Sequence, residues 1–236
     1  MNLPDVPIIS VIIPVYNESQ ILPKLLLFLK EAKDSRAIKE VIISDGQSSD
    51  NTLAIAEAFN SNVVVCKELG RALQLNWGAR NATGEILYFL HADSIPPQDF
   101  ISQILAAHHG GFQAGCFRLQ FDWSHWFLKL NAWFTRFNVN ALRFGDQSLF
   151  ITKKLFDKIG GFREDYLIME DQEIIYRIAK HSEFKVLPDY ITTSARKYRR
   201  NGVYRMQAIF YYIYLAYIFG ASQEKLKMLH WKLIIT

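Results

Sequence analysis

Apolar and polar residues alternate in blocks along the first 93 residues, and each block has the period of a strand or a helix. "IISVIIPVY" (8–16) is apolar and β-branched, as expected for a strand buried on both faces. The segment 17–33 repeats leucine and isoleucine at helical spacing, which predicts an amphipathic helix. The same order recurs, with strands at 41–44, 62–67 and 86–90 and helices at 50–59 and 70–82. This alternation predicts an α/β fold with a mostly parallel central sheet flanked by helices.

The pattern changes after residue 93. "QAGCFRLQFD" (113–122) predicts a strand in a separate, mixed region of sheet. The next segment predicts a helix with large apolar side chains along one stripe: Trp123, Trp126, Phe127, Leu130, Trp133, Phe134 and Phe137. Packing against a core or a dimer partner is the favoured interpretation, because apolar stripes usually face cores. A membrane-facing surface is the alternative.

The C-terminal residues differ from the rest in both charge and hydropathy. "AIFYYIYLAYIFG" (208–220) predicts a buried or interfacial helix, because it is shorter than the roughly 20 residues that span a membrane. "ARKYRRNGVYR" (195–205) predicts either a solvated basic loop or an anion site. The 236 residues suit one domain with a small extension, and a net charge of +4 does not indicate a nucleic-acid partner. The N-terminus shows no secretory leader, so a cytoplasmic protein is expected, with Cys66 and Cys116 as buried thiols.

Polar side chains follow four of the predicted strands, in "PVYNES", "SDGQSSD", "ELGRALQ" and "HADS". Ligands of such sheets bind outside the carboxyl ends of the strands, so these four segments predict one pocket. The chain has no G-x-G-x-x-G after its first strand and no P-loop motif. Dinucleotide-dependent enzymes and P-loop NTPases are therefore excluded.

The motifs "SVIIPVYNES", "VIISDGQSSDNT" and "FLHADS" together resemble the family-2 glycosyltransferases, which have the A-type glycosyltransferase fold. The resemblance extends to "FGDQSLF" (144–150), "IGGF" (159–162) and "MEDQEIIYRI" (169–178). It implies a single nucleotide-binding domain over residues 1–194, with a nucleotide-binding half (1–95) and an acceptor-binding half (96–194). A basic loop and apolar helices (195–236) would form a helical C-terminal extension.

The resemblance also implies a metal-dependent, inverting transfer of a sugar from a nucleotide-diphosphate sugar, with a slight preference for UDP. Asp45 would read the base, although Ser44 replaces the first acid of the family's "DDGS" pattern. Asp93 matches the last acid of the D-x-D motif and would bind Mg2+ or Mn2+, while His91 replaces the first acid. The remaining donor contacts implied are Pro14, Tyr16, Glu18, Arg71 and Ala92. For Asp45 and Asp93 the structural alternative is a turn cap.

On the acceptor side, the resemblance implies that Asp171 is the catalytic base. Glu170 would orient the acceptor or raise the pKa of Asp171, although both acids could simply favour the start of a helix. Asp146 and Gln147 would contact the acceptor, with a structural turn as the alternative. The basic loop from Arg196 to Arg200 could close over the diphosphate.

Two other functions stay open at the level of sequence. A nucleotidyltransferase uses a related sheet but needs a glycine-rich basic loop, which "PVYNES" lacks. A catalytically weak or inactive family member could bind a sugar nucleotide without turnover, as His91 in place of an acid allows. The acceptor is an unknown hydroxyl, with a lipid-linked one among the options. Loose attachment to the inner face of an anionic membrane is expected, and a homo-oligomer is an option.

Overall fold

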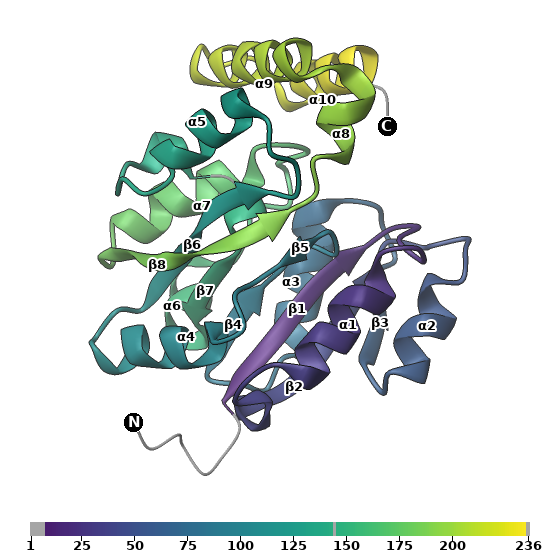
Figure 1. Cartoon of the computed structure of the whole chain (residues 1–236), viewed down its shortest axis with the longest axis vertical. Coiled ribbons are helices and arrows are strands. Elements are labelled where there is room, and N and C mark those ends of the chain that lie inside the picture. Colours follow the sequence, from purple (N-terminus) through teal and green to yellow (C-terminus); the bar gives the residue numbers. More distant parts are fainter. Residues whose placement is uncertain (1–7, 144, 235–236) are drawn as a thin grey trace.

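The computed structural model describes residues 8–143 and 145–234, which form an eight-stranded sheet flanked by helices (Figure 1). Phe144 of the predicted "FGDQSLF" motif and residues 1–7, on which the expectation about a secretory leader was based, lie outside these ranges. The strand order is β3-β2-β1-β4-β7-β6-β8-β5. The strands are β1 (Ile9–Val15), β2 (Ile38–Asp45), β3 (Asn62–Val65), β4 (Ile86–Phe89), β5 (Ser94–Ile95), β6 (Ala114–Phe121), β7 (Leu149–Thr152) and β8 (Phe184–Thr193).

The first half of the sheet is parallel, which confirms the prediction from the alternating pattern. β1 pairs in parallel with β2 and β4, and β2 pairs in parallel with β3. The helices that connect these strands are α1 (Leu22–Glu31), α2 (Thr52–Ala58) and α3 (Arg71–Asn81). Such crossovers return each strand in the same direction, so the polar segments after β1, β2 and β4 lie at one edge.

The second half of the sheet is mixed, as predicted for the strand at 113–122, and it is continuous with the parallel half. β7 is antiparallel to both β4 and β6 and therefore joins the two halves into one sheet. β6 then runs parallel to β8, and the short β5 is antiparallel to β8. The helices of this half are α4 (Phe100–His109), α5 (Trp126–Phe134), α6 (Lys153–Ile159) and α7 (Glu170–Ala179), with short 3-10 turns at Asn140–Leu142 and Gly145–Gln147. A further 3-10 turn, Ser35–Ala37, precedes β2 in the parallel half.

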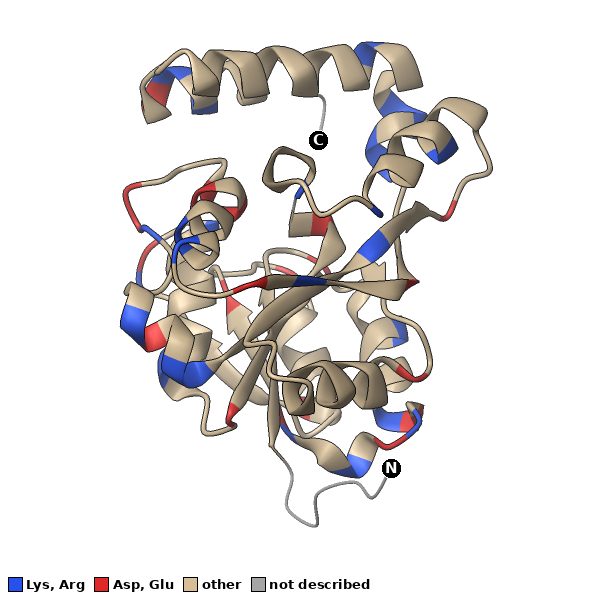
Figure 2. Ribbon diagram, turned by 90° about the vertical axis from the view of Figure 1, so that its left-hand side faces the viewer, with Lys and Arg blue, Asp and Glu red and all other residues tan. Residues whose placement is uncertain are grey.

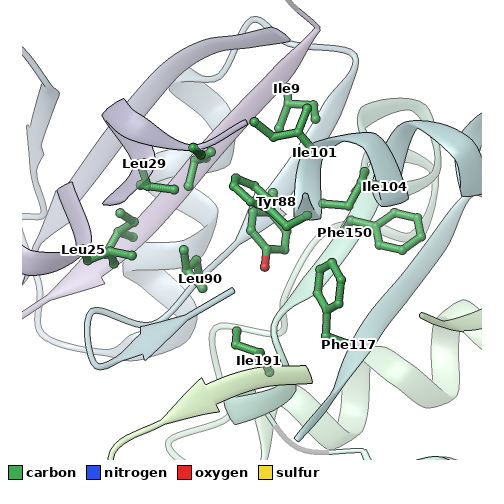
Figure 3. Close-up of a cluster of buried hydrophobic side chains, with 14 of the residues drawn as sticks. Ile9, Leu25, Leu29, Tyr88, Leu90, Ile101, Ile104, Phe117, Phe150 and Ile191 are labelled. Atoms are coloured by element: carbon green, nitrogen blue, oxygen red, sulfur yellow. The ribbon is translucent and has the colours of Figure 1, made fainter. Parts of the chain in front are cut away.

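Apolar side chains fill both faces of the sheet. On one face, α1 and α4 cover a cluster in which Leu25, Ile104 and Tyr88 pack together with Phe117 and Phe150 (Figure 3). On the other face, α3, α6 and α7 cover a second cluster around Ile12, Leu87 and Ile174. Burial on both sides explains why β1 and β4 are continuous apolar runs. Cys66 and Cys116 are free and buried, as predicted.

The C-terminal residues form a layer of helices at one end of the molecule (Figure 1). The basic segment predicted as a loop is instead a helix, α8 (Arg196–Asn201), because Tyr198 is buried against Phe121 and Phe210. The longer helices α9 (Val203–Ile218) and α10 (Gln223–Leu233) follow. Together with Leu128 of α5 they form a third hydrophobic cluster. Among the described residues, no helix has both the length and the apolar character needed to span a bilayer.

The aromatic stripe of 123–137 packs against a core only in part, through Trp123 and Phe127 at the third cluster, and its packing against a dimer partner stays a prediction. The buried residues of α5 are Leu128 and Ala132. The stripe instead leaves several large side chains exposed: Trp126, Leu130, Trp133, Phe134 and Phe137.

Candidate active site

A pocket of about 500 Å3 opens beside the carboxyl ends of β1 and β4. Four parts of the chain supply most of its lining: the loop after β1, the start of α3, the turn after β4, and α8. Seven of the residues predicted for the site line this pocket: Pro14, Tyr16, Glu18, Arg71, Ala92, Asp93 and Asp146. The prediction that the strand-end motifs converge on one hollow is therefore confirmed for "PVYNES", "ELGRALQ" and "HADS".

Asp45 is fully buried at the end of β2, behind the loop that follows β1. Its Oδ2 accepts a hydrogen bond from the backbone N–H of Ser48 at 2.9 Å, so the turn-capping role exists. Its Oδ1 is buried without a hydrogen-bond partner. A buried acceptor without a donor is costly. Asp45 itself is not among the residues that line the pocket.

A second feature ties this turn to the first loop. Asn17 Oδ1 accepts from the backbone N–H of Ser49 at 2.8 Å, and the backbone N–H of Glu18 donates to Thr52 Oγ1 at 2.9 Å. The "PVYNES" and "SDGQSSD" segments are thus fixed against each other. A ligand that contacts the first loop would also lie close to the turn of Asp45.

Arg71 joins the two halves of the chain. Its Nη1 lies 3.4 Å from Glu170 Oε1 and 3.6 Å from Asp171 Oδ2, so the first residue of α3 bridges both acids at the start of α7. Burial disfavours the charged guanidinium, but these carboxylates outweigh it and raise the pKa of Arg71. Asp171 therefore lies beside the pocket that Arg71 lines.

Asp171 has the properties of a general base. Burial, followed by the negative charge of Glu170, raises its pKa to about 6, and Arg71 and His91 oppose that rise. A carboxylate of this pKa is mostly ionised at pH 7 yet accepts a proton more readily than an ordinary Asp. The backbone at Gly145 approaches it so closely that a Cβ there would collide with the carboxylate of Asp171.

His91, Asp93 and Asp146 lie on the same side of the pocket. His91 Nδ1 is 3.7 Å from Asp146 Oδ1, and burial together with the charge of Arg71 lowers the pKa of His91 to about 4. The imidazole is therefore neutral at pH 7, which is the state that binds metal ions. Asp93 Oδ2 lies 3.7 Å from Arg196 Nη2.

The donor set fits a divalent cation only with help from a ligand. Within residues 8–143 and 145–234, no group of three or more His, Cys, Asp or Glu side chains is placed to hold a metal ion alone. Asp93 offers carboxylate oxygens and His91 a neutral ring nitrogen, both at the pocket wall. Mg2+ and Mn2+ accept such donors and fill their remaining positions with phosphate oxygens and water.

Helix α8 brings positive charge to the pocket wall beside Asp93. Arg196 forms a bidentate ion pair with Glu18, with contacts of 2.8 and 3.1 Å. Lys197 and Arg200 also line the pocket. The basic segment therefore lies at the predicted place beside the pocket, but as a helix.

Gln147 is turned away from the pocket. It is buried, and its amide nitrogen donates to the backbone oxygen of Phe117 in β6 at 3.2 Å. This position does not fit the acceptor contact predicted for Gln147, because the side chain points into the sheet. Asp146, one residue earlier, does line the pocket.

Two further residues at the site were not identified from the sequence. Gln74, one turn into α3, donates to the backbone oxygens of Val15 at 2.7 Å and Ser44 at 2.9 Å, and so holds the ends of β1 and β2. The signal available in the sequence was that Gln74 is a polar residue on the buried side of a helix. His230 of α10 lies close enough to Lys197 and Arg71 that their charges, after burial, lower its pKa to about 4. Its proximity depends on how α10 packs, which the sequence does not indicate.

A family model described as glycosyl transferase family 2 matches residues 10–164, which is more than half of the chain. The chain belongs to glycosyl transferase family 2. The match contains the first loop, Asp45, Arg71 and the "HADS" turn, and it ends before Asp171. The resemblance found in the motifs is therefore confirmed at the level of the family.

Curated relatives agree with this family but are matched only in part. The chain is 34% identical over 104 residues to "Uncharacterized glycosyltransferase YfnE" of Bacillus subtilis. It is 30% identical over 129 residues to the "Undecaprenyl-phosphate 4-deoxy-4-formamido-L-arabinose transferase" of Proteus mirabilis. These matches cover 42% and 51% of this chain but only 26% and 40% of the relatives.

Solved structures share the fold. The mannosyltransferase PcManGT from Pyrobaculum calidifontis, in complex with GDP-Man and Mn2+, superposes with a TM-score of 0.72 at 20% identity, covering 89% of this chain and 62% of that one. TarS 1–349 from S. aureus gives a TM-score of 0.67 at 18% identity, covering 85% of this chain and 64% of that one. The A-type glycosyltransferase fold predicted for this chain is therefore confirmed.

Proposed function

We propose that this family-2 member is a metal-dependent, inverting glycosyltransferase that moves a sugar from a nucleotide-diphosphate sugar to a hydroxyl acceptor. The observation that carries the proposal is Asp171, a carboxylate with its pKa raised to about 6 and held by Arg71 beside the pocket. The other donor residues converge on the same pocket from four segments of the chain.

The nucleotide part of the donor would bind in the pocket against the first loop, next to the turn of Asp45. The unpartnered Oδ1 of Asp45 would accept a hydrogen bond from the base. Tyr16, which is 56% exposed at the pocket, offers a ring face to the base. Of the nucleotides, UDP is slightly favoured, and the related structures include complexes with UDP, UDP-GlcNAc and GDP-Man.

The diphosphate would lie toward α8 and the "HADS" turn. Lys197 and Arg200 supply positive charge there, with the backbone of Ala92 at the wall. Asp93 and His91 would hold Mg2+ or Mn2+ together with phosphate oxygens. Such a cation, when bound, neutralises the negative charge that grows on the leaving diphosphate.

The transfer itself needs a proton acceptor on the acceptor side. The acceptor oxygen attacks the anomeric carbon while the bond from that carbon to the diphosphate oxygen breaks, and the nucleoside diphosphate leaves. Asp171 takes the proton from the attacking hydroxyl, and attack from the face opposite the leaving group inverts the configuration. Glu170 keeps Asp171 basic, and Arg71 fixes the position of both carboxylates.

The acceptor would contact Asp146 near Asp171. A lipid-linked hydroxyl or phosphate is the class that the name of the Proteus mirabilis relative suggests. Such an acceptor would place the reaction at a membrane surface. A sugar-nucleotide-binding member without turnover is the second candidate, because His91 replaces an acid and Arg196 and Arg71 already engage Asp93 and Asp171.

One set of measurements distinguishes these functions. Calorimetry measures the binding of UDP, GDP and dTDP in the presence of Mn2+. A second assay supplies the corresponding sugar nucleotides together with acceptors from a lipid extract, and it measures turnover as the amount of nucleoside diphosphate released. Asp171→Asn should lower turnover by about 10²–10⁴-fold and leave nucleotide affinity unchanged. Asp157→Asn, which changes an exposed acid on α6, is the matched control. Nucleotide binding without any turnover would favour the second candidate, and binding of none of the nucleotides would overturn both.

A further inference from the structure

Two helices, α9 and α5, expose apolar faces to solvent. On α9 the residues on the outer face are spaced at helical intervals: Tyr204, Tyr211, Tyr212, Leu215, Ile218 and the adjoining Phe219, each at least half exposed. The opposite face of α9 packs into the third hydrophobic cluster through Met206 and Ile213. α9 is therefore apolar on both sides, and the large side chains of its outer face stay at least half exposed. An exposed apolar face of this extent is unusual on a protein that stays in water.

The exposed stripe of α5 continues this surface. Trp126 and Trp133 lie two turns apart on one side of α5 and are 62% and 43% exposed. The ring of Tyr204 lies 6.4 Å from that of Trp126, and Tyr211 donates a hydrogen bond to Asn131 of α5 at 2.8 Å. We call the combined outer faces of α5 and α9 the aromatic face.

Positive charge surrounds the aromatic face. Residues 123–142 contain Lys129 and Arg136 and no acid. Residues 203–236, which include α9 and α10, contain Arg205, Lys225, Lys227 and Lys232 and the single acid Glu224, although the whole chain has a net charge of only +4. In Figure 2 the top helical layer is mostly tan, with blue near both of its ends and red at one of them. An anionic lipid surface fits this composition, because tyrosine, tryptophan and leucine suit the bilayer interface and the surrounding lysine and arginine attract anionic headgroups.

We propose that the aromatic face is a docking surface for an anionic lipid bilayer, into whose interface the side chains of α5 and α9 insert. Trp and Tyr suit this depth because their rings are apolar and their N–H and O–H groups stay in contact with headgroups. Arg136, stacked 4.6 Å above the ring of Trp133, and Lys129 would reach the lipid phosphates.

The proposal also sets where the pocket lies relative to the lipid. α8, which supplies Lys197 and Arg200 to the pocket, directly precedes α9. Docking through α9 would bring the pocket close to the headgroup layer, where a lipid-linked acceptor would present its reactive group. Only this part rests on the proposed function. Because vesicle binding is measured without turnover, the two proposals can fail separately.

The test is co-sedimentation of the full chain with vesicles of phosphatidylcholine alone or with 30% phosphatidylglycerol. We expect binding to the anionic vesicles, weakening as salt is raised, and a blue shift of tryptophan fluorescence from Trp126 and Trp133. Trp133→Ser combined with Phe137→Ser should reduce binding by at least about tenfold. Leu27→Ser, which removes an exposed leucine on α1, should leave it unchanged.

Charge is tested separately. Lys129→Glu combined with Arg205→Glu should weaken binding roughly thirtyfold, on the general contribution of each cation near an anionic surface. Lys30→Glu on α1 is the matched control. Failure of the wild-type chain to bind anionic vesicles would overturn the proposal, and so would equal binding by the aromatic variant. A stable dimer that Trp133→Ser and Phe137→Ser dissolves would also overturn it, because the aromatic face would then be an interface between two copies.

Discussion

Replacing Glu170 by glutamine tests whether the negative charge of Glu170 raises the pKa of Asp171. Glu170 is only 3% exposed, and it shares the guanidinium of Arg71 with Asp171. The two contacts of Arg71 Nη1, 3.4 and 3.6 Å, mean that these carboxylate oxygens are at most about 7 Å apart. After burial, Glu170 is the strongest influence that raises the pKa of Asp171.

The size of the effect follows from this separation. Two unit charges about 7 Å apart interact by about 2 kcal/mol at an effective dielectric constant of about 20. That energy corresponds to about 1.5 pKa units, and solvent at Asp171, whose side chain is 21% exposed, reduces it somewhat. Glu170→Gln should therefore lower the pKa of Asp171 from about 6 by roughly one unit.

The assay is the pH dependence of kcat/KM, which reports the ionisation of the free enzyme. Because the base must be ionised, activity falls as the pH drops through the pKa of Asp171. The midpoint of this acid limb should move down by about one pH unit in Glu170→Gln. The matched control is Glu173→Gln on the same helix, whose carboxylate pairs with Arg177 at 2.6 Å and should leave the midpoint unchanged.

Two results would refute the reasoning. An acid limb that stays in place while kcat falls at every pH would mean that Glu170 acts only by positioning Arg71. An equal shift in Glu173→Gln would mean that the limb reports the net charge of α7 rather than the pair at its start. Circular-dichroism melts across the same pH range would confirm that both variants stay folded.

Three further outcomes are expected. Burial and Glu170 hold the pKa of Asp171 in the folded state at about 6, above its ordinary 3.8. Ionised Asp171 therefore lowers the free energy of unfolding by at most about 3 kcal/mol above pH 6, and this loss disappears as the pH falls toward 4. Asp171→Asn should therefore raise the melting temperature at pH 7.5 but not at pH 4, and equal gains at both would contradict this. Gly145→Ala places a methyl group on the carboxylate of Asp171, so kcat should fall sharply in a turnover assay, whereas Gly110→Ala should not lower it. Asp45→Asn replaces the unpartnered acceptor with a donor, so the Kd for UDP in calorimetry should rise about tenfold, and an unchanged Kd would remove Asp45 from the base contact.

The parallel half of the fold and most of the donor side could be predicted from the sequence. The apolar runs of β1 and β4 are buried on both faces, so the change from apolar to polar residues marks clearly where each strand ends. The side chains of Glu18 and Asp93, at the ends of two such runs, converge because parallel strands place their carboxyl ends at one edge.

The features that the sequence did not predict all depend on contacts between distant segments. α8 is helical because Tyr198 is buried against Phe121 and Phe210, which overcomes the repulsion expected among its neighbouring cations. On α5 the spacing correctly shows an apolar stripe, but it does not show which side packs. The smaller Leu128 and Ala132 take the buried side.

The third hydrophobic cluster has a consequence for how the chain can be divided. Leu128 of α5 and Met206 and Leu226 of the last helices are all fully buried in that one cluster. A chain shortened at residue 194 would therefore lose its last helices and also expose the buried side of α5 to solvent. Deletion libraries should show an abrupt loss of soluble product once trimming passes Leu226, rather than a gradual decline.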